Sequence, residues 1–328
     1  MRLALAALIA ATLPLAALPL AAQAAPPQVL TDTPVVQSLA AQVMGDLGQP
    51  GLLLDRGADP HNFQLRPSQA TALRDAGLLV QVGPELTPWL TRALDGIGRK
   101  GPVLALLTAE GTTLRRFGDA AQAHDHSDHG HDHDHDHDHA HDDHGHDDHG
   151  HDHSPDAIDP HAWLDPANAQ VWLKAIAAEL ARLDPENATT YTANAAVAAA
   201  EIAALDGALA AELAALGGRP FVVFHDAYGY LADHYGLTIA GAIALGDAAA
   251  PGAARLGAIR DTLRQGGAVC IFPEAQHDPA LVATATESTA TRVGGRLDPA
   301  GTTLEPGPGL YADLMRGLVT TIADCLKG

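Results

Sequence analysis

Short apolar runs alternate with helical patterns along the first third of the chain. Four runs have the length and composition of strands: residues 29–30, 51–54, 78–82 and 103–107. A helix is predicted to begin at Pro34, because the apolar residues that follow it are spaced three or four positions apart. Strands that alternate with helices indicate an α/β fold in which the strands form a parallel sheet.

A long helical pattern occupies the middle of the chain. Residues 185–217 are rich in alanine and glutamate, carry an apolar stripe with helical spacing, and end at a pair of glycines. A helix of about 32 residues would span roughly 48 Å. Gly207 lies inside the pattern, where glycine costs about 1 kcal/mol and allows a kink or a break.

The alternation of strands and helices returns after this helix. The predicted strands are residues 221–225, 237–243, 268–272 and 292–297, and the predicted helices are residues 251–265, 278–288 and 309–326. We therefore predict an α/β protein with two lobes, each a mostly parallel sheet with flanking helices. The N-terminal lobe covers residues 25–184, one long rigid helix over residues 185–217 joins the lobes, and the C-terminal lobe covers residues 218–328.

The first 24 residues have the features of a secretory signal peptide. Arg2 precedes a long apolar run, and residues 22–24 fit the small-x-small pattern of a cleavage site. A membrane anchor is the alternative, but Pro14 and Pro19 interrupt the run. We therefore predict export and cleavage after about Ala24. No later stretch has about 18 uninterrupted apolar residues, so we expect a soluble mature chain.

Residues 118–158 interrupt the α/β pattern with a low-complexity sequence. Of the net charge of −21, the eleven aspartates of residues 124–153 contribute −11, and this stretch has no lysine or arginine. So few apolar side chains bury too little surface to offset the entropy of ordering, which predicts a disordered loop. The acidity argues against nucleic acid as a partner, and its combination with histidine indicates binding of cations.

Three histidines outside this loop share an informative setting. His61 and His161 each follow Asp-Pro, which ends regular structure, and His225 ends an apolar strand. In open parallel sheets, ligands bind beyond the carboxyl ends of the strands. A single histidine is more often a structural residue, but three in matching contexts favour a metal site in the cleft between the lobes. Asp298 also follows a strand; it either joins this site or caps a turn.

The donor types point to one ion. Three imidazoles with a carboxylate or a water suit tetrahedral Zn²⁺, whereas Mn²⁺ prefers more oxygen.

Six sequence segments occur in an order that is specific to one family. They are "GADPHNFQLRPSQ", "VGPELTPWL", "DPHAWLDP", "FHDAYGY", "AVCIFPEAQ" and "RLDPAG", with the His- and Asp-rich loop between the second and the third. In these segments the chain resembles the periplasmic zinc-binding proteins of zinc ABC importers, within the metal-specific cluster of solute-binding proteins. The resemblance covers essentially the whole mature chain. It implies two α/β lobes joined by a rigid long helix, with the metal between them.

The resemblance also implies roles for individual residues. His61, His161 and His225 match the zinc ligands of the family. Some relatives have glutamate directly before the first ligand; this chain has proline there, so Asp298 or a water is expected to complete the shell. Cys270 and Cys325 match a disulfide of zinc members. From the residues alone, an even pair in an exported protein suggests a disulfide, and two unpaired buried thiols are the alternative.

The function implied is high-affinity capture of Zn²⁺ in the periplasm and delivery to an inner-membrane ABC permease. We expect a monomer without enzymatic activity, and a periplasmic zinc chaperone is a further candidate partner. Two alternatives are a manganese importer component and a zinc-dependent hydrolase, in which three histidines and an open position would activate water. The hydrolase lacks support from any HExxH or comparable signature.

The histidines of the loop are expected to form several weaker sites that collect or sense zinc, because ordering the loop around metal costs entropy. A solvated linker without metal is the alternative. These histidines are His124, His126, His129, His131, His133, His135, His137, His139, His141, His144, His146, His149, His151 and His153.

Six further residues receive structural interpretations. We expect Glu274 to hydrogen-bond a ligand imidazole. His234 is expected on a helix surface. His277 is expected in a turn, with a second site shared with the loop as the alternative. Phe224, Tyr228 and Tyr230 are expected to pack around His225.

Overall fold

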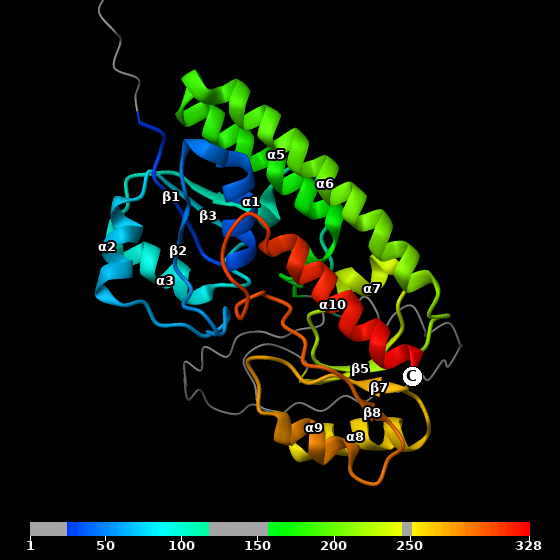
Figure 1. Ribbon diagram of the computed structural model, residues 1–328. Helices are drawn as coiled ribbons and strands as arrows, with labels where there is room; N and C mark the ends of the chain where they lie inside the picture. The colour runs from blue at the N-terminus through cyan, green and yellow to red at the C-terminus, as the bar shows by residue number, and fades with distance from the viewer. Residues whose placement is uncertain (1–24, 118–156, 245–250) are drawn as a thin grey trace, which may run out of the picture.

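A computed structural model of the chain describes residues 25–117, 157–244 and 251–328 (Figure 1). The predicted signal peptide, residues 1–24, lies outside the described residues. So does nearly all of the predicted loop, since residues 118–156 are not described. Within the described ranges, no helix has both the length and the apolar composition that crossing a membrane requires.

The N-terminal sheet has four parallel strands in the order β2-β1-β3-β4. The strands are β1 (Val29–Thr31), β2 (Gly51–Leu52), β3 (Leu78–Gln81) and β4 (Val103–Ala105). Its helices are α1 (Pro34–Met44), α2 (Pro67–Asp75) and α3 (Pro88–Ile97). Each of the three helices begins with proline, whose fixed φ suits the first position and whose missing N–H would have no partner there.

The side chains of β3 alternate between the two faces of this sheet. Leu78 and Val80 join the core that contains α1, whereas Leu79 joins a separate cluster with Trp89 and Leu73 of α3 and α2. Both faces are therefore covered, as a parallel sheet requires. The predicted strand at residues 103–107 is shorter than expected, because its last residues turn into the 3₁₀ helix η2 (Leu106–Thr108).

The C-terminal sheet is also parallel, in the order β6-β5-β7-β8. Its strands are β5 (Phe221–His225), β6 (Ile239–Ala244), β7 (Cys270–Ile271) and β8 (Arg292–Val293). Its helices are α7 (Gly229–Tyr235), α8 (Ala253–Arg264), α9 (Pro279–Thr286) and α10 (Leu310–Lys327). Helices α8 and α9 lie on one face of the sheet, and α10 lies on the other (Figure 1).

The last predicted strand, residues 292–297, ends early at Val293. The next residue, Gly294, has the Phe272 ring where a Cβ atom would be, at 2.3 Å, so the chain there passes too close to the ring for any side chain.

One long helix lies along both lobes, as the sequence predicts. Helix α6 (Ala188–Ala214) has 27 residues and passes Gly207 without interruption, and the 3₁₀ helix η4 (Pro185–Asn187) precedes it. Helix α5 (Pro166–Leu183) lies beside α6 over most of its length (Figure 1). The side chain of Asp165 caps α5 by accepting the N–H of Ala167 at 2.8 Å.

Helix α10 connects the two lobes a second time. It packs on α6 and also on α1 of the N-terminal lobe. The backbone N–H of Tyr311 donates to the Ser38 hydroxyl at 3.1 Å, and the Tyr311 hydroxyl donates to the Trp163 carbonyl at 3.0 Å. One continuous apolar core therefore includes residues of both sheets, from Val29 to Leu326. The boundaries given above for the N-terminal lobe, the linking helix and the C-terminal lobe remain a prediction.

A disulfide between Cys270 and Cys325 joins β7 to α10, across 55 residues of sequence. We expect replacement of both cysteines by serine to lower the free energy of unfolding by about 2–4 kcal/mol, since the crosslink restricts the unfolded chain. Urea unfolding of the variant and of the oxidised wild type measures the difference. Reduced wild type is the control and should match the variant; equal midpoints for variant and oxidised wild type would contradict the prediction.

Asp32 is a fully buried carboxyl at the end of β1, where it accepts the N–H groups of Thr33 at 2.7 Å and Val82 at 2.8 Å. Burial raises its pKa to about 7, against the effect of these hydrogen bonds. Between pH 4 and 7 the folded protein therefore holds one more proton at Asp32 than the unfolded chain. The free energy of unfolding should then fall as the pH rises through this window, by up to about 4 kcal/mol.

The measurement is urea unfolding between pH 4 and 8 for wild type and Asp32→Asn. Only the pH dependence is compared, because the amide also changes the hydrogen bonds to Thr33 and Val82. The variant should lose this part of the pH dependence, and parallel curves for the two proteins would refute the assignment.

Candidate metal centre

The two Asp-Pro-His sequences fold into the same kind of turn. The backbone N–H of His61 donates to Asp59 Oδ1 at 2.9 Å, and the N–H of His161 donates to Asp159 Oδ1 at 3.0 Å. The intervening proline prevents regular structure, and the aspartate caps the backbone of the histidine two residues later. In each turn, the aspartate and the proline that precede the histidine therefore fix the backbone that carries the imidazole.

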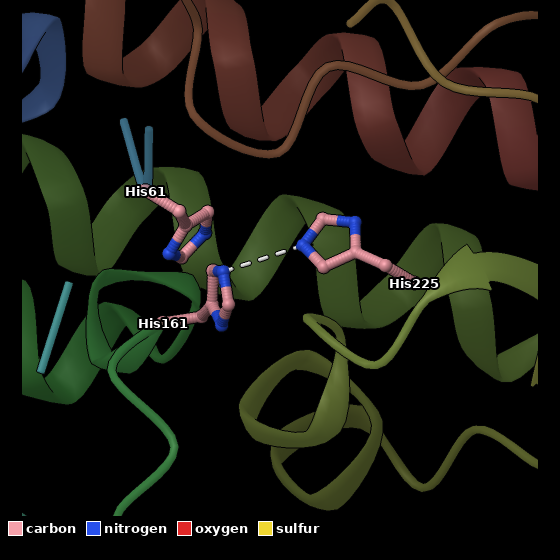
Figure 2. Close-up of side chains that lie close together, drawn as sticks. All are labelled: His61, His161 and His225. Carbon is pink, nitrogen blue, oxygen red and sulfur yellow. Dashed lines mark hydrogen bonds between the residues drawn. The ribbon is translucent and has the colours of Figure 1, made fainter. Parts of the chain in front are cut away.

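His225 is the last residue of β5, at the carboxyl end of the C-terminal sheet. The structure brings it together with His61 and His161, and the three rings point toward a common centre (Figure 2). His161 Nε2 and His225 Nε2 are 3.4 Å apart, and the ring centroid of His61 lies 5.3 Å from that of His161 and 6.1 Å from that of His225. One nitrogen from each ring lies within 4.8 Å of the others.

These distances fit a tetrahedral ion. Two nitrogens at 2.0–2.1 Å from Zn²⁺ in tetrahedral geometry are about 3.3 Å from each other, which is close to the separation of His161 and His225. The cavity that the three rings line has a volume of about 10 Å³. It therefore fits a single ion rather than an organic ligand.

Buried carboxylates orient two of the three rings. Asp159 Oδ1 lies 2.8 Å from His161 Nδ1, and Glu274 Oε2 lies 2.5 Å from His225 Nδ1. A hydrogen bond at Nδ1 leaves Nε2 for the metal and fixes the ring. The hydrogen bond expected of Glu274 is therefore present, and Tyr228 adds a second one by donating to Glu274 Oε1 at 3.0 Å. Burial alone would raise the pKa of Glu274, but His225 and His277 hold it below its ordinary value.

Arg115 holds Asp159 in place, and sequence reasoning missed it. Its guanidinium lies 3.5 Å from Asp159 Oδ2 and donates to Asp233 of α7 at 2.8 Å. The Tyr230 hydroxyl accepts the N–H of Arg115 and donates to the Asp159 carbonyl, and its packing around His225 stays a prediction. A Cβ atom on Gly229 would lie 2.1 Å from the guanidinium, so only glycine leaves room for it.

The structure does not bring Asp298 into the cluster of three histidines. Asp298 Oδ2 accepts the N–H and the hydroxyl of Thr303, at 2.8 and 2.7 Å, and Oδ1 accepts the N–H of Thr302 at 3.2 Å. Gln276 also donates to Oδ1 at 3.0 Å. In this structure Asp298 therefore caps the turn that follows it, and its role as fourth ligand stays a prediction.

Two other histidines take specific positions. His234 lies on α7, as expected, and is held between Asp165 and Asp206 at 2.9 and 2.8 Å. His277 lies in the turn that follows Glu274, as expected. It lines the same cavity as the three histidines and stacks on Phe224 with ring centroids 4.2 Å apart. The fourteen loop histidines lie outside the described residues, so their weak sites stay a prediction.

Comparison with known proteins gives a family for this site. The model of the family described as "Zinc-uptake complex component A periplasmic" (ZnuA) matches residues 29–325. The chain belongs to the ZnuA family. The high-affinity zinc uptake system protein ZnuA of Paracoccus denitrificans (strain Pd 1222) is 57% identical over 97% of both chains. The protein of the same name from Brucella suis biovar 1 is 39% identical over 89% of both.

Solved structures share the fold of this ZnuA-family chain at lower identity. A crystal structure of ZnuA superposes with a TM-score of 0.71 at 23% identity, and covers 92% of this chain and 99% of its own. The solute-binding protein FpvC of Pseudomonas aeruginosa in complex with Mn²⁺ has a TM-score of 0.73 at 19% identity, over 92% and 98%. These matches establish the two-lobed α/β architecture for the ZnuA-family chain and leave the choice of ion to the site itself.

Proposed function

We propose that this protein captures Zn²⁺ with high affinity in the periplasm and delivers it to an ABC permease of the inner membrane. The observation that carries the proposal is the convergence of three imidazoles, from both lobes, on one ion-sized cavity. The chemistry is binding and release, so no catalytic step is assigned. The names of the relatives, high-affinity zinc uptake system proteins, support zinc as cargo.

The donor set favours Zn²⁺ over Mn²⁺. The three grouped ligands are all nitrogen, and imidazole suits zinc, whereas Mn²⁺ is better served by carboxylate and water oxygens. His61, His161 and His225 are the proposed ligands, with Asp298 or a water as the fourth. Recruitment of Asp298 would require it to leave the turn at Thr303.

The test is titration of the full-length protein with Zn²⁺ against a calibrated chelator, alone and with excess Mn²⁺. We expect one tight zinc site that Mn²⁺ does not displace and that is lost in the triple variant H61A/H161A/H225A. A tight site that persists in the triple variant would overturn the ligand assignment. Preferential retention of Mn²⁺ would make the protein a manganese-binding component instead.

The proposal extends to parts of the chain beyond this site. We infer cleavage after about Ala24, action as a monomer, and zinc collection or sensing by the fourteen histidines of residues 124–153. Deletion of residues 124–153 should lower the number of zinc ions bound while one tight site remains. Loss of the tight site in the deletion protein would show that the loop, and not the three-histidine site, binds zinc more tightly.

A further inference from the structure

A second group of metal-binding side chains lies directly beside the three histidines. Among the described residues, ligand atoms of His225, Glu274 and His277 also lie within 4.8 Å of one another. We propose that these three side chains form an outer position for a divalent cation, through which zinc enters and leaves the three-histidine site. The proposal rests on the proposed function, which identifies zinc as the transported ion. It adds the path by which that ion reaches and leaves the three-histidine site.

The Glu274 carboxylate is the centre of the outer position. Its Oε2 atom lies 2.5 Å from His225 Nδ1 and 3.6 Å from His277 Nε2. A cation inserted among these atoms would gain one carboxylate oxygen and two imidazole nitrogens, which is an accepted zinc donor set with one coordination position left for water. The contact between Glu274 Oε2 and His225 Nδ1 would have to open from 2.5 Å to about 3.3 Å, the separation of two ligand atoms in a tetrahedral zinc site.

His277 gives the outer position access to solvent. Its side chain is 26% exposed, whereas the side chains of His161 and His225 are 2% and 6% exposed. The parallel stack on Phe224, with an interplanar angle of 9°, holds the ring. Its centroid is 5.7 Å from that of His225, so this partly exposed ring lies next to a buried ligand of the inner site. Each position therefore has one partly exposed histidine, His61 in the inner site and His277 in the outer position, and an ion that arrives at His277 reaches the outer position first.

His225 belongs to both positions but serves one at a time. A neutral imidazole has one nitrogen that binds metal and one that carries a proton. With the ion in the outer position, Nδ1 binds it and Nε2 keeps the proton, which can be donated to His161 Nε2 at 3.4 Å. When the ion moves inward, Nε2 releases its proton to water and Nδ1 takes up a proton from water. The new Nδ1–H then donates a hydrogen bond to Glu274. The number of protons on His225 is unchanged, and the two positions are occupied in turn.

The first experiment measures zinc binding and release by stopped flow, with tryptophan fluorescence as the signal because Trp163 lies 5.3 Å from His161 between ring centroids. The variant is His277→Phe, which keeps an aromatic ring on Phe224 and removes the nitrogen donors. The control is His234→Phe, the same change at a similarly exposed histidine outside the cavity.

We expect the rates of binding and release in His277→Phe to fall together by about tenfold, corresponding to about 1.4 kcal/mol in the barrier, so that Kd changes much less than either rate. The control should keep wild-type rates. Wild-type rates in His277→Phe would overturn the outer position. A weaker Kd caused by faster release alone would also overturn it, since His277 would then act as a ligand or support of the inner site.

The second experiment locates the ion directly. In His161→Ala the inner site lacks a ligand, so crystals of the full-length variant soaked in Co²⁺ should show anomalous density among His225, Glu274 and His277. Adding His277→Phe should remove that density. Absence of density in the single variant would overturn the proposal. A wild type without a tight zinc site would instead refute the proposed function, so the two failures are distinguishable.

Discussion

The His225→Ala variant should lose at least two orders of magnitude in affinity for Zn²⁺. Binding of zinc at four-ligand protein sites is worth about 10–16 kcal/mol, so one ligand accounts for roughly 3 kcal/mol, or about 100-fold in Kd. The loss of binding free energy on removal of His225 should be larger than this average for one ligand. Its removal also leaves the buried Glu274 carboxylate without the imidazole that holds it at 2.5 Å.

Competition with a calibrated zinc chelator measures the change in Kd. His234→Ala is the matched control, because His234 interacts with Asp165 and Asp206 and lies outside the cavity. It should keep the wild-type Kd. If His225→Ala bound zinc within tenfold of wild type, the ion would have to lie elsewhere than at the three imidazoles.

The Arg115→Ala variant should lose about 3–5 kcal/mol in the free energy of unfolding, because it removes one partner of a buried ion pair. Arg115 and Asp159 are 6% and 0% exposed in their side chains. Without the guanidinium, the Asp159 carboxylate keeps only the contact with His161 Nδ1 and loses its cationic partner. We therefore expect weaker zinc binding as well, since the orientation of His161 depends on Asp159.

Urea unfolding measures the loss of stability. Arg56→Ala is the control, because Arg56 pairs with Glu305 at the surface, where the two side chains are 62% and 78% exposed. It should change stability by less than about 1 kcal/mol. Gly229→Ala should act in the same direction as Arg115→Ala, because the added methyl group displaces the guanidinium. Equal stability of Arg115→Ala and Arg56→Ala would contradict the prediction.

Much of the fold follows from local sequence. The apolar stripe and the closing glycines predict α6, and proline at the first helical position marks the starts of α1 and α5. The ends of strands are less predictable. Val103–Ala105 and Arg292–Val293 are shorter than the predicted strands, because pairing with a neighbouring strand sets where a strand ends.

The site divides in the same way. The Asp-Pro-His turns make His61 and His161 recognisable in the sequence, because the hydrogen bond and the proline that position each histidine lie within three consecutive residues. The partners of the site lie far along the chain. Glu274 is 49 residues from His225, and Arg115 is 44 residues from Asp159. No local pattern marks Arg115, since its role depends on Asp159 and on the space left by Gly229.

By itself, the sequence determined the α/β class, the long central helix, the family resemblance and the three histidines, because each of these is written in local spacing or in short motifs. Only the tertiary structure decided that the three imidazoles meet at one small cavity, that Asp298 caps a turn, and that His277 lies beside Glu274. These are contacts between segments brought together by the packing of two sheets and α10. Burial and distance among distant residues exist only after the chain has folded.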